Sequence, residues 1–106
     1  MSEPLSISTA FQTFMRDAPQ HAQAWGAMTQ ALASASALEK KTAALAYLAV
    51  LAALRLGSGV PFHVKSAKQA GASRAEIISA ILIGLPAAGN AVAQVLPVAL
   101  ATYDAE

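Results

Sequence analysis

The chain has 106 residues, no cysteine and a net charge of +1, with no run of like charges. These features exclude disulfides, cysteine nucleophiles and cysteine metal sites, and they leave no basic surface for nucleic acid. The length suits a single domain, residues 1–106. Only 12% of the residues are charged, against roughly 25% in an average soluble domain. We therefore expect apolar surface to be covered by a partner chain or by a membrane.

The membrane alternative rests on the uncharged segment Ile77–Ala101, because a spanning helix needs about 20 apolar residues. Helix-breaking and polar residues interrupt this segment at Gly84, Pro86, Gly89, Asn90, Gln94 and Pro97. The sequence therefore predicts a buried helix in a homo-oligomer, with no membrane partner. The first residues lack the basic and apolar blocks of a signal peptide, which favours the cytoplasm.

Two helices are predicted in the first third of the chain. The first repeats apolar residues at helical spacing, at Ile7, Phe11 and Phe14. Ser8 or Thr9 can cap its start, and the segment 17–19 ends it, because the residue before a proline avoids the helical conformation. Pro19 suits the first turn of the second helix. One stripe of that helix consists of His21, Trp25, Met28 and Leu32. A loop is predicted around Ser34 and Ser36.

The third predicted helix runs from Glu39 to about Leu56. An acidic residue at its start suits the positive end of the helix dipole. No face is polar between Ala43 and Leu54, so we expect a central helix that is buried on all sides. Gly57 is predicted to take the left-handed conformation that stops this helix.

The fourth predicted helix covers about Val60 to Ala70, after the turn at residues 56–61. Its apolar side includes His63, and its lysines lie on the other side. Gly71 is predicted to cap its end.

The fifth predicted helix starts at a capping box made of Ser73 and Glu76, and its last turn lies at residues 86–89. The sixth covers about Ala88 to Tyr103, and Pro97 is predicted to kink it. No stretch alternates with a period of two, as strands would. The predicted fold class is therefore all-α, with about six helices.

These segments, taken in order, resemble the carboxymuconolactone decarboxylase family, which includes the alkyl hydroperoxide reductase D-like peroxidases. The resemblance rests on Leu38-Glu39-Lys40-Lys41-Thr42, Leu45, Leu48-Ala49-Val50, His63-Val64, Ala67 and Ala70-Gly71-Ala72-Ser73-x-x-Glu76-Ile77. It is extended to about residues 11–103 by Phe11, Phe14, Pro19, Trp25, Gly84, Pro86 and Gly89. The resemblance implies an all-α fold that forms a homo-oligomer, with a hexamer as first choice and a dimer or trimer as alternatives.

The resemblance also implies a site. In the family's peroxidase branch, a glutamate, a CxxC pair and a histidine form a proton relay and a redox dithiol. Aligned without gaps, the glutamate position falls on Ala44 and the cysteine positions on Leu56 and Gly59, with Ser58 just before the second. Of the relay, only His63 is retained. A thiol peroxidase needs a thiolate nucleophile, so this activity should be absent.

His63 is the candidate catalytic residue, because an imidazole can act as acid or base near neutral pH. Ser58, Ser66 and Tyr47 are candidates to line a pocket with it, and Ser66 is one helical turn away. A Ser58–His63 pair lacks the orienting acid of a catalytic triad. The alternative is a buried, structural His63 that is hydrogen-bonded to a backbone carbonyl.

A second histidine, His21, is predicted to lie at the edge of the core. With His63 and either Glu39 or Glu76 it could bind zinc, but the sequence has no close-spaced ligand pair. We therefore predict neither a metal nor another cofactor. Two functions stay open. One is a small apolar pocket near His63 that binds a small molecule or performs acid–base chemistry on it. The other is a non-catalytic helical assembly module.

Overall fold

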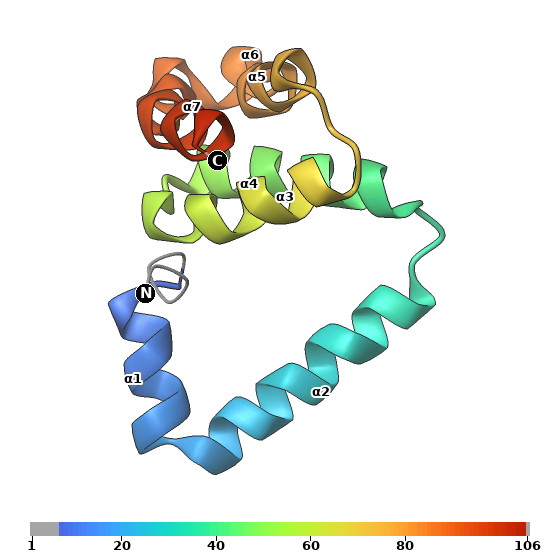
Figure 1. Ribbon diagram of the computed structural model, residues 1–106, viewed down its shortest axis with the longest axis vertical. Helices are drawn as coiled ribbons and strands as arrows, with labels where there is room; N and C mark the ends of the chain where they lie inside the picture. The colour runs from blue at the N-terminus through green and yellow to red at the C-terminus, as the bar shows by residue number, and fades with distance from the viewer. Residues whose placement is uncertain (1–6, 106) are drawn as a thin grey trace. The chain divides into compact units, whose positions relative to one another are not determined.

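The computed structural model describes residues 7–105, which are helical or lie in short connections (Figure 1). Six α-helices of nine residues or more occur among these residues, and none of them forms a strand. This confirms the predicted all-α class. None of the helices between residues 7 and 105 is long and apolar enough to cross a membrane. The chain divides into two compact units, one up to Leu38 and one from Glu39 onward. The single domain therefore stays a prediction.

The N-terminal unit contains α1 (Thr9–Asp17) and α2 (Pro19–Ala35). The Ser8 hydroxyl accepts a hydrogen bond from the backbone N–H of Phe11 at 3.1 Å, so Ser8 is the cap. Pro19 lies in the first turn of α2, where its missing N–H leaves no hydrogen bond unmade. The predicted loop at Ser34 was wrong, since α2 includes this residue. The alanines around Ser34 have the highest helix propensity and extend the helix.

The C-terminal unit is built from α3 (Lys40–Leu54), α4 (Val60–Gln69), α5 (Arg74–Leu82), α6 (Leu85–Ala88) and α7 (Leu96–Asp104). Two short 3₁₀ helices, η2 (Gly57–Gly59) and η3 (Asn90–Val95), connect them. Within this unit α3 packs against α4 and α5, and α7 packs against α4 and α5 (Figure 1). The core lies between these helices and consists of Leu48, Leu51, Ala52, Val60, Val64, Ala67, Ala72, Ile77, Ile81, Val92, Val95 and Ala99.

Helix α3 starts as predicted and ends differently. The Glu39 carboxylate accepts a hydrogen bond from the backbone N–H of Thr42 at 2.8 Å. At the other end Arg55, not Gly57, takes the left-handed conformation, with φ 60° and ψ 38°. This geometry lets the N–H of Leu56 reach the carbonyl of Leu51 at 2.9 Å, the closing bond of a Schellman motif. Gly57 belongs to η2 instead.

The prediction that α3 is buried on all sides was wrong for the single chain. Its buried residues are Leu48, Leu51 and Ala52. The elements that pack against α3, namely α4, α5 and the two 3₁₀ helices, leave Tyr47, Val50 and Leu54 exposed. That another copy of the chain covers these exposed residues of α3 stays a prediction.

The second half of the unit confirms the caps and corrects the last helix. Gly71 takes φ 99° after α4. The Ser73 hydroxyl accepts from the N–H of Glu76, and the Glu76 carboxylate accepts from the N–H of Ser73. The predicted sixth helix with a kink at Pro97 is instead η3 followed by α7, with Pro97 in the first turn of α7. Proline is favourable there because the first helical N–H groups need no intrahelical partner.

Candidate functional site

His63 lies on α4 beside the buried face formed by Val60, Val64 and Ala67, and this position leaves its side chain partly buried. Burial lowers the pKa of His63 from its ordinary value of 6.5, because desolvation disfavours the charged imidazolium. The imidazole is therefore mostly neutral at pH 7, and one ring nitrogen can accept a proton.

The His63 ring contacts two aromatic rings. Tyr47 of α3 lies with its ring centroid 4.5 Å from that of the imidazole, at an interplanar angle of 48°. Phe62, the preceding residue, makes an edge contact at 5.1 Å and 85°. No residue between 7 and 105 forms a hydrogen bond with the imidazole, so the carbonyl partner of the structural alternative is not found there.

The structure brings Tyr47 to His63, as the pocket hypothesis requires. Ser66 is exposed on α4, one turn after His63, and Ser58 is exposed in η2. Neither serine makes a described contact with the imidazole. The contact with Phe62 was not anticipated, although adjacency in the sequence is its signal. His21 is exposed on α2, and residues 7–105 hold no group of three His, Asp or Glu side chains that could bind a metal.

A separate groove of about 470 Å³ runs between α3 and α5. From α3 it is lined by Thr42, Leu45, Ala46 and Ala49, and from α5 and its end by Glu76, Ser79, Ala80 and Ile83. Sequence reasoning missed this groove, because helical spacing places Thr42, Leu45, Ala46 and Ala49 on one side of α3 without showing which helix lies beside them.

At one end of this groove the Glu76 carboxylate is fully engaged. It accepts the Ser73 N–H at 2.9 Å and the Lys41 Nζ at 3.1 Å. These interactions, the backbone hydrogen bond first, lower the pKa of Glu76. The groove therefore offers no free charge.

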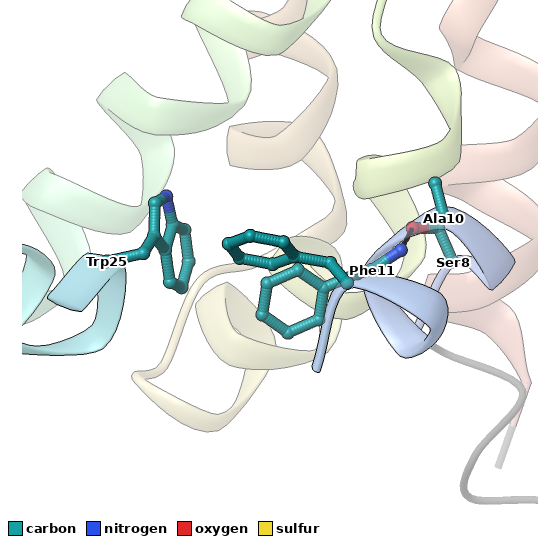
Figure 2. Close-up of a pocket in the computed structure, with 5 residues that line it drawn as sticks. Ser8, Ala10, Phe11 and Trp25 are labelled. Carbon is teal, nitrogen blue, oxygen red and sulfur yellow. Dashed lines mark hydrogen bonds between the residues drawn. The ribbon is translucent and has the colours of Figure 1, made fainter. Parts of the chain in front are cut away.

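A second hollow, of about 380 Å³, lies in the N-terminal unit (Figure 2). It is lined by Ser8, Ala10, Phe11, Phe14 and Trp25. The Phe11 ring lies 5.9 Å from Phe14 and 5.1 Å, edge-on, from Trp25, so that aromatic contacts hold α1 against α2. His63 and its three candidate neighbours line neither hollow, and a pocket at His63 stays a prediction.

The comparisons with known proteins give one positive result. The model of the carboxymuconolactone decarboxylase family matches residues 19–101. No curated protein and no solved structure matches the chain significantly. The match spans well over half of the chain and includes α2, α3 and the helix that carries His63. The chain is a cysteine-free member of the carboxymuconolactone decarboxylase family.

Proposed function

We propose that this protein binds a small molecule beside His63 and performs acid–base chemistry on it, without the thiol chemistry of the family's peroxidases. The observation that carries the proposal is a partly buried imidazole beside Tyr47 with no hydrogen bond to residues 7–105. A general base must be mostly deprotonated at working pH, and burial of His63 favours that form.

Tyr47 is the second polar group at this site. Its phenol can donate a hydrogen bond to a carbonyl or carboxylate of the ligand, while the rings of Tyr47 and Phe62 hold the imidazole by contact. A neutral imidazole can then take a proton from a ligand atom and return it. A structural His63 would be expected to use its ring for packing alone, so that its removal would affect assembly or stability and not ligand binding.

We also propose that the working form is a homo-oligomer, with a hexamer as first choice. Support comes from the apolar residues that the single chain leaves exposed on α3 and just after it, namely Val50, Leu54 and Leu56. Covering such surface is favourable, at about 25 cal/mol per Å² of apolar area.

The first test uses carboxymuconolactone, the compound in the family's name, with release of carbon dioxide as the readout. In parallel, the ring signals of His63 are followed by NMR as the lactone is added. We expect a ligand-dependent shift of the His63 signals, and we expect His63→Ala to abolish both binding and turnover. His21→Ala is the matched control, because it removes the exposed histidine of α2.

Two outcomes contradict the proposal with carboxymuconolactone as the ligand. One is an intact protein that neither shifts the His63 signals nor releases carbon dioxide. The other is a His63→Ala variant that loses its assembly while binding the ligand unchanged, which makes His63 structural.

A further inference from the structure

Helix α2 has an apolar stripe that its own unit covers only at Trp25, where the Phe11 ring of α1 makes an edge contact. No residue of α2 is buried, and the helix contains no Asp, Glu, Lys or Arg. Trp25, Met28 and Leu32 are 43%, 49% and 62% exposed. Their spacing places them on one face, over about 11 Å at 1.5 Å per residue. Most helical stability in proteins comes from packing of such a face, so the exposed part of the stripe, at Met28 and Leu32, favours a further surface to pack against.

The groove between α3 and α5 is the complementary feature. It is lined by the small side chains of Ala46, Ala49 and Ala80 and by the larger Leu45 and Ile83. Small residues between larger ones form the holes that side chains of an approaching helix fill. Along α3 the groove runs from Thr42 to Ala49, the same number of residues as from Trp25 to Leu32. A stripe of large side chains thus matches a groove of small ones in length.

Charge does not oppose this match. The ionic group that lines the groove is Glu76, and it is already paired with Lys41 and with the start of its own helix. Packing an uncharged helix on the remaining, apolar part leaves no carboxylate without a partner. This avoids the main cost of burying charged groups.

We propose that α2 of a second copy of this chain docks into the α3–α5 groove. Each copy carries one stripe and one groove, so two copies can exchange α2 reciprocally and cover both features in each. The groove then becomes an interface that the second copy completes. This inference rests on the homo-oligomer proposed above and not on the role of His63.

The absence of cysteine makes a direct test possible. One protein carries Met28→Cys and a mass tag, and the other carries Ala49→Cys without a tag. They are unfolded together, refolded and oxidised. We expect a covalent heterodimer of the tagged and untagged chains on a non-reducing gel, because stripe and groove meet across copies.

Two control pairs use the same chemistry at positions outside the proposed contact. Gln30→Cys replaces Met28→Cys, because Gln30 lies on the opposite face of α2. Gln69→Cys on α4 replaces Ala49→Cys, because Gln69 is exposed outside the groove. We expect loss of the heterodimer in both control pairs. Equal heterodimer in test and control pairs overturns the proposal.

Sedimentation of the unmodified protein separates the two proposals. An oligomer without the specific heterodimer means that the copies associate elsewhere, which overturns the docking of α2 and leaves the homo-oligomer standing. A monodisperse species of 10.8 kDa overturns both. A Met28→Cys, Ala49→Cys double variant that cross-links only within its own chain also overturns the second copy as occupant.

Discussion

At His63 the surroundings act on the imidazole through contact and burial. The rings of Tyr47 and Phe62 lie against it, and burial alone lowers its pKa. With no hydrogen bond to residues 7–105, nothing in that part of the chain holds one tautomer. In the proposed complex we expect the ligand to determine which ring nitrogen carries the proton.

The lowered pKa of His63 predicts how stability depends on pH. The unfolded chain has a pKa near 6.5 and the folded chain a lower one, so the unfolded state binds the proton more readily. Well above 6.5 both states are neutral and His63 contributes nothing to the pH dependence. As pH falls from about 6.5 through the folded pKa, the folded state loses stability relative to the unfolded state.

Urea unfolding across that pH window measures this effect. We expect His63→Ala to remove the part of the decline that His63 causes, while His21→Ala retains it. A ring signal of His63 that titrates at or above 6.5 would contradict the prediction.

The chain has no cysteine, and the gapless comparison with the family's peroxidase branch puts Leu56 and Gly59 at its dithiol positions. We therefore expect no dithiol-dependent reduction of an organic hydroperoxide, because no side chain supplies a thiolate. The measurement is hydroperoxide turnover coupled to a dithiol reductant. Activity above that of a heat-killed control would refute this.

Helix ends show what local sequence determines. The starts of α1, α3 and α5 were predicted, because Ser8, Glu39 and Ser73 bond to N–H groups within their own first turn. The end of α3 was not predicted correctly. The left-handed residue is Arg55, which comes just before the residue, Leu56, whose N–H bonds to the carbonyl of Leu51. Gly57 lies two residues too late for this role. The start of α7 was missed although its signal is local, since Pro97 lies in the first turn of that helix.

Arg55 gives a prediction for α3. A non-glycine residue in the left-handed region costs roughly 1–2 kcal/mol, because its Cβ crowds the carbonyl oxygen. Arg55→Gly removes this crowding, and we expect it to raise the free energy of unfolding by about 1 kcal/mol after the extra freedom of glycine in the unfolded chain is deducted.

Arg55→Ala is the matched control, because it removes the same exposed side chain and keeps the Cβ. Denaturant unfolding of the two variants decides the matter. A stability of Arg55→Gly that is no higher than that of Arg55→Ala would show that the conformation carries no strain.

Candidate sites, like helix ends, could be predicted from the sequence only where a local pattern marks them. His63 was a candidate because the family pattern marks it, and Tyr47 was one of three candidate neighbours, of which it alone makes a described ring contact with His63. The α3–α5 groove was not predicted, because it forms only when residues 42–49 pack beside residues 76–83. Periodicity within one helix shows which residues share a face, and it does not show how far apart two faces lie.

At the scale of the whole molecule, the low fraction of charged residues, 12%, is the main reason to expect self-association. The C-terminal unit buries its core between α3, α4, α5 and α7 and leaves large apolar side chains outside it. The exposure of each side chain in the Ile77–Ala101 segment shows where a charged substitution can test self-association without disrupting the core. Ile81 is fully buried in the core, so that a charge there would unfold the chain, whereas Ile83 is 71% exposed.

We expect the unmodified protein to sediment well above 10.8 kDa at micromolar concentration. An obligate interface typically buries roughly 2,000 Å² or more, and its surplus free energy must exceed the lost freedom of the subunits. Ile83→Glu places an unpaired carboxylate on that surface, and we expect it to shift the protein to smaller species while its helical content is retained.

Ala75→Glu is the control, because this exposed residue lies in the first turn of α5, where an acidic group is favourable. Sedimentation velocity with circular dichroism on the three proteins measures both quantities. Equal sedimentation of Ile83→Glu and the unmodified protein would remove Ile83 from the interface.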